Sequence, residues 1–229
     1  MTSEEIRRKT LREVLLVYVL TLLTIRGVVM AERSLSLPDE VGVLVPILFI
    51  YVPLWVLERR RLDPADYGLV LEGVWPALRY NLKIWALVFP PFLIANHFYQ
   101  GLLFDREPLR IWPHDLIKDV FAYHLLYVAL PEEFFYRGWM QGRLNQLWPR
   151  DRRLFGVAFG KGLWVTALLF TAGHSLVIFR WWHFSILVPA LIFGWIRERS
   201  PNVLTSTVFH ASCNILMVLL DTAYGVIPP

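Results

Sequence analysis

Six polar or ionisable residues interrupt three apolar stretches in the second half of the sequence. They are Glu132, Glu133, Arg137, His174, His210 and Asn214. Such side chains are costly inside membrane segments and usually serve a function there. A carboxylate beside imidazoles can activate a water molecule, and an imidazole or an amide can stabilise an oxyanion. This set of residue types therefore predicts hydrolysis.

The positions of these residues along their stretches place them at similar depths. At ~1.5 Å of rise per helical residue, Glu132 and His210 each lie ~16 Å from the basic end of their own stretch, and His174 lies ~20 Å from its own. Both depths are near the middle of a hydrocarbon core of ~30 Å. We therefore expect the three side chains to meet at one site.

Helical spacing assigns different roles to the two glutamates. Three pairs stand four positions apart and share a helix face: Glu133 with Arg137, Phe170 with His174, and His210 with Asn214. Arg137 is expected to hold Glu133 as an anion, which leaves Glu132 to face the histidines. Adjacent helical residues point ~100° apart, so the two carboxylates are not expected to face the same partner. Pro131 is expected to bend this helix or to start a new one.

Two other mechanisms are open to the same residues. Glu132, His174 and His210 form a ligand set that zinc accepts, although the sequence has no HExxH motif and a metal-free reaction is favoured. Cys213 could act as a nucleophile with His210, but an apolar helix lacks the positive surroundings that generate a thiolate. Taken singly, Asn214 is expected to be a helix–helix contact and Phe170 a packing residue. The remaining histidines, His97, His114, His124 and His183, are expected at span ends or in loops, apart from the site.

Composition identifies the elements that must position the site as membrane helices. Apolar residues make up 56% of the 229 residues and charged residues 18%, against about 45–50% and about 25% in soluble proteins. Since a spanning helix needs ~20 apolar residues, the chain is expected to be an all-α bundle of about seven transmembrane helices. The expected spans are Glu13–Met30, Val41–Leu57, Ile84–Tyr99, Val120–Gly142, Leu163–Phe179, Phe184–Ile196 and Val203–Leu220.

The basic residues predict the orientation of the bundle. Arginines and lysines gather before the first span and in the connections after the second, fourth and sixth, and they are sparse in the alternate connections. The positive-inside rule then places the N-terminus in the cytoplasm. The same clustering indicates topology signals rather than a nucleic-acid surface. We expect one membrane domain over residues 1–229, with N-terminal helices in 1–118 and catalytic helices in 119–220.

Three motifs in this chain resemble those of a known family. Pro131–Gly138 (PEEFFYRG) is similar to the EExxxR motif of the CPBP intramembrane proteases, which include the CAAX prenyl endopeptidases and bacteriocin-processing relatives. Phe170–His174 is similar to the family's FxxxH motif and His210–Asn214 to its HxxxN motif, in the family's order. The resemblance implies an endopeptidase in which Glu132 activates water and His174, His210 and Asn214 complete the site, with Glu133, Arg137 and Phe170 in support.

The expected substrate is a membrane-anchored protein or peptide, cut in a membrane-proximal or C-terminal segment. The short loops indicate a bacterial inner-membrane protein, and some bacterial relatives are associated with exosortase-like or myxosortase-like sorting systems. No nucleic-acid partner and no cofactor are expected, with zinc as the alternative. The competing hypothesis is a non-catalytic immunity or scaffold protein, or a proton-linked carrier.

Overall fold

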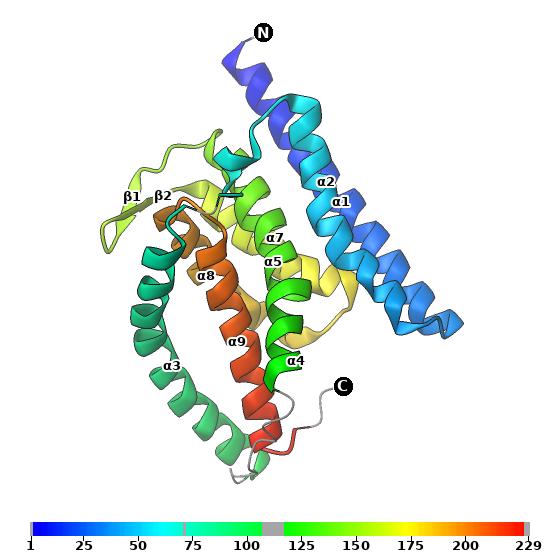
Figure 1. Ribbon diagram of the computed structural model, residues 1–229, viewed down its shortest axis with the longest axis vertical. Coiled ribbons are helices and arrows are strands. Elements are labelled where there is room, and N and C mark those ends of the chain that lie inside the picture. Colours follow the sequence, from blue (N-terminus) through cyan, green and yellow to red (C-terminus); the bar gives the residue numbers. More distant parts are fainter. Residues whose placement is uncertain (1, 71, 107–116, 227–229) are drawn as a thin grey trace.

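Three long helices form the N-terminal half of the chain. The computed structural model describes residues 2–70, 72–106 and 117–226. Helix α1 (Ser3–Leu35) begins at a capping box between Thr2 and Glu5, and α2 (Leu44–Arg60) returns antiparallel along it (Figure 1). Helix α3 (Val74–Phe104) contains Pro90 and Pro91 in its interior and bows around the opposite side of the molecule, against α9 (Figure 1).

A central helical run carries the two glutamates and winds in an unusual way. It comprises α4 (Ile117–Ala122), a first π segment (Tyr123–Ala129), α5 (Leu130–Glu133), a second π segment (Phe134–Met140) and α6 (Gln141–Asn145). Pro131 lies in the first turn of α5, and the backbone before it is helical, with φ −68° and ψ −45° at Ala129. The expected break at Pro131 is therefore a change from π to α winding, in a run that stays helical.

Three further helices complete the bundle. They are α7 (Lys161–Val177), α8 (Leu187–Arg199) and α9 (Leu204–Ala223), and a 3₁₀ turn (Trp181–Ile186) joins the first two. Strands β1 (Arg152–Leu154) and β2 (Val157–Phe159) form a small antiparallel hairpin before α7, which the sequence analysis did not predict. Phe155 and Gly156 both have positive φ there, as a two-residue hairpin turn requires.

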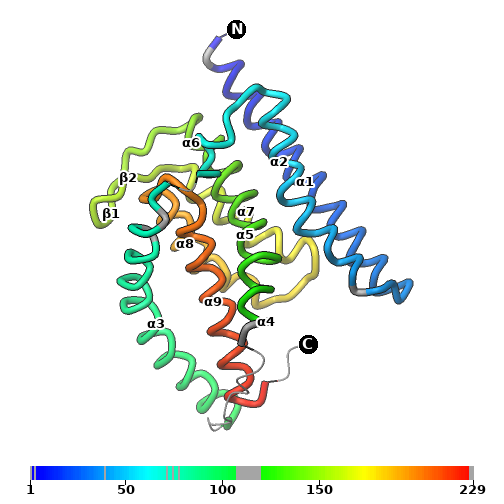
Figure 2. Tube along the Cα trace, viewed as in Figure 1, coloured from blue at the N-terminus to red at the C-terminus, as the bar shows by residue number. Residues whose placement is uncertain are grey.

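The expected architecture of about seven membrane helices is confirmed. Within the described residues the helices group into seven runs, and each expected span falls on one of them with shifts of a few residues at most ends. Helix α1 extends well beyond its expected span at both ends, and α8 is short, with 13 residues, as the sixth span was expected to be. Figure 2 shows the chain crossing back and forth along one long axis.

The core of the bundle lies around the second π segment. Phe134, Phe135 and Trp139 are each at most 1% exposed. They pack against α1 and α2, where the Phe49 ring of α2 lies 5.1 Å from the Phe135 ring. A second cluster, built around Phe193 and Phe209, joins α3, α8 and α9. The second π segment is therefore enclosed by protein, whereas Phe121, Tyr123 and Leu126 near the start of the run are exposed.

Candidate active site

Glu133 and Arg137 form a buried ion pair in the central run, as their spacing predicted. Arg137 Nη1 lies 3.5 Å from Glu133 Oε1, and both side chains are fully buried. The guanidinium also donates to the backbone carbonyl of Ala190 in α8 at 3.2 Å and lies 4.1 Å from the centre of the Phe170 ring. These contacts compensate for a charge that has no access to bulk water.

His210 of α9 joins the two glutamates, which corrects the expectation that they face different partners. Its Nδ1 lies 3.0 Å from Glu133 Oε1, and its Nε2 lies 3.9 Å from Glu132 Oε2. The ring stacks on Phe193 at 4.5 Å between centroids, which fixes its plane. Side chains on adjacent helical positions diverge, but an imidazole has a nitrogen on either side and can contact both carboxylates at once.

Glu132 is the more accessible of the two carboxylates. Its side chain is 18% exposed, whereas that of Glu133 is 0% exposed. Glu132 Oε2 is buried and accepts no hydrogen bond from the described residues. A carboxylate oxygen in this state requires a water molecule or a substrate group as its partner.

His174 faces the same pocket as Glu132. Its Nδ1 lies 2.9 Å from the carbonyl oxygen of Phe170, one turn earlier in α7. A carbonyl can only accept, so Nδ1 carries the proton and a neutral ring presents the lone pair of Nε2. Phe170 lies between the two histidines, with ring centroids 4.7 Å from His174 and 5.9 Å from His210.

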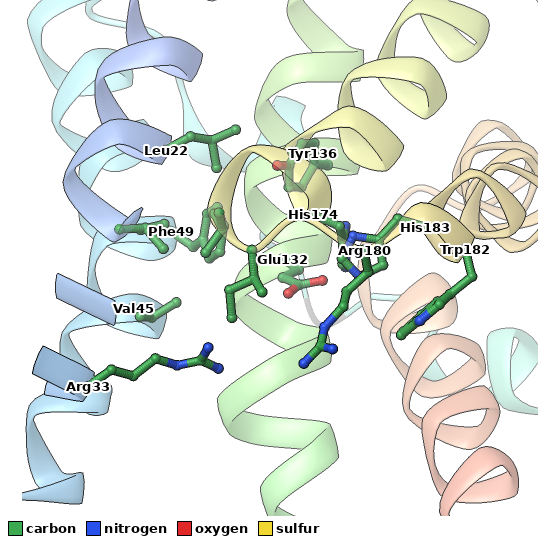
Figure 3. A pocket seen from close by; sticks show the side chains of 14 residues that line it. Leu22, Arg33, Val45, Phe49, Glu132, Tyr136, His174, Arg180, Trp182 and His183 are labelled. Atoms are coloured by element: carbon green, nitrogen blue, oxygen red, sulfur yellow. The ribbon is translucent and has the colours of Figure 1, made fainter. Parts of the chain in front are cut away.

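The pocket has a volume of about 350 Å³ and lies between α1, α2, α7 and the central run. Figure 3 shows Glu132 and His174 pointing into it, below Leu22 and Tyr136. Most of the wall is apolar, as is usual for ligand sites, with a few convergent polar groups. Arg26 of α1 donates to the Leu176 carbonyl at 2.7 Å and so attaches the end of α7 beside the pocket.

Asn214 is less closely joined to the other candidates. It is half-buried on α9, one turn after His210, and does not line the pocket that Glu132 and His174 share. Cys213 is half-buried beside the second core cluster. The structure thus brings Glu132, Glu133, His174 and His210 together and leaves Asn214 at the edge of the group.

Two histidines lie closer to the site than the sequence analysis expected. His124 lies near the start of the central run, as expected, in the first π segment, and it is near enough to His210 for the two rings to interact electrostatically. His183 does lie in the connection between α7 and α8, but it lines the pocket, and its ring centroid is 5.8 Å from that of His174. Burial lowers the pKa of the His183 imidazole, and His174 and Arg180 lower it further.

The two other histidines do not join the site among the described residues. His97 lies on α3, and its ring contacts the Tyr224 hydroxyl at 2.8 Å. His114 lies outside the described residues. His124 stands eight positions before Glu132, a helical spacing that could have indicated a shared face. No spacing rule connects His183 to the site, because the contact is made between a loop and two helices.

Zinc was the alternative to a metal-free site. Glu132 and His210 approach each other, and His174 presents its free Nε2 on the pocket wall. However, among the described residues no three His, Cys, Asp or Glu side chains are arranged so that they could hold one metal ion. The donor types fit zinc, and their arrangement does not.

Comparison with known proteins supports the resemblance that the motifs indicated. Residues 118–216 match the family model described as type II CAAX prenyl endopeptidase Rce1-like. No curated protein and no solved structure matches the chain. The matched region begins near the start of the central run and contains all three motifs. In this region the chain is similar to the CAAX-type (CPBP) intramembrane proteases, which are membrane-embedded hydrolases.

Proposed function

We propose that this protein is an endopeptidase that hydrolyses a peptide bond in a membrane-proximal or C-terminal segment of a membrane-anchored protein or peptide. One observation carries the proposal: Glu132, the accessible carboxylate, opens onto a pocket with His174 and has His210 behind it. A carboxylate that is buried among structural partners only would have no reason to line a cavity. The family match supports the same chemistry.

In this mechanism Glu132 is the general base. It removes a proton from a water molecule held between its carboxylate and the Nε2 lone pair of His174. The new C–O bond forms a tetrahedral intermediate, and the Glu132 proton passes to the nitrogen of the leaving amine as the C–N bond breaks. The proposed oxyanion donors are His210, which as an imidazolium would donate through Nε2–H while Nδ1–H bonds Glu133, and Asn214, which lies one turn further along α9 and outside the pocket. Glu133 and Arg137 position His210 and do not touch the reacting atoms.

The test compares the termini of membrane proteins between wild-type cells and cells that carry Glu132→Ala. The expected result is that one or a few proteins keep an uncut segment or accumulate as precursors in the variant. Glu58→Gln is the matched control, because Glu58 is an exposed carboxylate on α2 and its loss should change nothing. If wild-type and Glu132→Ala cells have the same termini, the protein is not a peptidase, and a scaffold or carrier role gains support.

We further propose that the protein resides in a bacterial inner membrane with its N-terminus in the cytoplasm. The N-terminal end of α1 and the hairpin β1–β2 lie at the same end of the molecule (Figure 1), and both are rich in arginine. Reporter fusions placed after Arg153 and after Pro229 should report opposite sides of the membrane. Both reporters on one side would contradict this orientation.

A further inference from the structure

Two arginines line the outer part of the catalytic pocket. Arg33 comes from the last turn of α1, and Arg180 comes from the connection between α7 and α8. Figure 3 shows Leu22 and Tyr136 at one end of the pocket and both guanidinium groups at the other end. Glu132 lies between these two ends. The pocket is thus open toward the ends of α1 and α7 that lie away from the N-terminus.

Arg33 is exposed and Arg180 is half-buried. Among the described residues, Glu132 is the one acid that lines this pocket. Within the described part of the chain, neither arginine lies within ion-pair distance of a carboxylate. By contrast, most other buried or site-facing charges, such as Arg137 and Glu133, are paired. Two unpaired guanidinium groups that share a cavity form a site for an anion, since each offers a planar fork of donors.

The remaining wall indicates what the anion is attached to. Leu22, Ile25, Val45, Phe49, Val177 and Ile178 give the pocket an apolar lining between the arginines and Glu132. A short extended peptide with apolar side chains fits such a lining, and a volume of about 350 Å³ suits a few side chains rather than a two-chain lipid. A carboxylate on that peptide would meet the arginines while a peptide bond lies at Glu132.

We propose that Arg33 and Arg180 form a subsite that binds a carboxylate of the substrate peptide, either its C-terminus or an Asp or Glu side chain. This inference rests on the proposed function, and it adds the substrate class and the residues that select it. The two arginines also offset the repulsion that the Glu132 carboxylate would exert on an acidic substrate. They are specificity residues and take no part in bond cleavage.

The test measures peptide binding without turnover. Purified protein carrying Glu132→Gln is titrated with three apolar hexapeptides: one with a free C-terminal carboxylate, one amidated with a single Asp, and one amidated without an acid. At least one of the two acidic peptides is expected to bind about tenfold or more tightly than the neutral one, as for a charge-assisted hydrogen bond. The comparison between the two acidic peptides identifies which carboxylate is recognised.

Additional substitutions in the Glu132→Gln protein then locate the binding. Arg33→Gln and Arg180→Gln should each reduce the preference for acidic peptides, and the double variant should abolish it. Arg106→Gln is the matched control. This substitution removes the same charge, but Arg106 follows α3 and does not line the pocket. Melting curves of all variants exclude unfolding as the cause of weaker binding.

Several outcomes would overturn the inference. Equal binding of all three peptides, or no binding of any, means that the arginines do not recognise a peptide carboxylate. The same conclusion follows if the arginine variants bind acidic peptides normally but lose phosphatidylglycerol in nanodiscs, since the ligand would then be a lipid phosphate. None of these results bears on the terminus comparison with Glu132→Ala, so a failed subsite and a failed peptidase proposal can be told apart.

Discussion

The peripheral helices and the helices of the site differ in length, in apolar character and in how far protein buries them. The segments long and apolar enough to cross a bilayer, among the described residues, are Glu4–Leu35, Glu40–Arg60, Leu78–Phe104 and Leu204–Ala223. The central run carries two acids and an arginine in its middle, and α7 and α8 are short. These four segments include α9, which carries His210, whereas α7 and α8 fall outside the group because they have 17 and 13 residues.

Burial shows the same contrast directly. In the most apolar window of α3, 11% of the residues are buried inside the protein, and Leu87 and Leu102 are 68% and 80% exposed. Every residue of the second π segment is buried. The peripheral helices can thus tolerate substitution as long as they remain apolar, whereas the central run depends on specific contacts. Seven substitutions measure this difference.

The largest effect is expected at Glu132. Glu132→Gln should reduce cleavage by about 10²–10⁴-fold, the usual contribution of a general base. Its melting curve should stay close to that of the wild type, because the side chain is partly exposed and His210 Nε2 lies 3.9 Å from its carboxylate. Purified protein in detergent allows both measurements. If the Glu132→Gln protein still cleaves the substrate, and the Glu133→Gln protein is stable but inactive, the general base is Glu133.

The buried ion pair should dominate stability. Glu133→Gln and Arg137→Ala each leave an uncompensated group inside the protein, which costs about 3–5 kcal/mol in buried pairs. Arg8→Ala is the matched control, since Arg8 and Glu4 form another pair at the same spacing with side chains 70% and 69% exposed. Its loss should change stability by about 0.5 kcal/mol or less. Similar melting temperatures for Arg137→Ala and Arg8→Ala would contradict the contrast between buried and exposed regions.

A pair of glycines offers a finer comparison. A Cβ at Gly173 in α7 would lie 2.7 Å from the Tyr136 hydroxyl, whereas a Cβ at Gly101 in α3 would meet nothing within 4 Å. Gly173→Ala should therefore cost about 1–3 kcal/mol by overpacking. Gly101→Ala should be neutral or stabilise α3 by up to about 1 kcal/mol. Thermal unfolding of the two variants should shift in opposite directions, and a shared direction would refute the difference.

The smallest effect is expected at Cys213. This residue lies among the site helices, yet its only assigned role is to pack beside the cluster of Phe193 and Phe209. Cys213→Ala should therefore keep most of the cleavage rate. The measurement is the same cleavage assay at matched protein concentration. Complete loss of activity in a normally folded variant would revive the thiol mechanism.

The sequence predicted the features that depend on one helix at a time. Hydropathy located the seven helices, and spacing predicted the Glu133–Arg137 pair, because both follow from helical geometry within a single segment. The depth estimate correctly brought Glu132 close to His210, although the two belong to different helices. Their catalytic roles stay predictions until the variants are measured.

Features that depend on contacts between segments could not be predicted in this way. Spacing gives the face of a residue on its own helix, but it does not say which neighbour that face meets. The double contact of His210, the pocket position of His183 and the position of Arg33 and Arg180 on one pocket all arise from such packing. The π winding was missed because no residue type marks it, and the hairpin because Gly156 is its only strong turn signal.

The two π segments have a consequence for changes in chain length. A π turn accommodates one residue more than an α turn, so it is the usual result of a single-residue insertion into an α-helix. Deletion of one residue inside the first π segment, Tyr123–Ala129, would let that segment rewind as α-helix with both flanks in phase. The second π segment cannot lose a residue between Glu133 and Arg137 in the same way, because the ion pair depends on their spacing. A one-residue deletion between Lys161 and His174 in α7 would turn His174 by ~100°. Homologues can therefore differ in length within the first π segment, and α7 must keep its residue count up to His174.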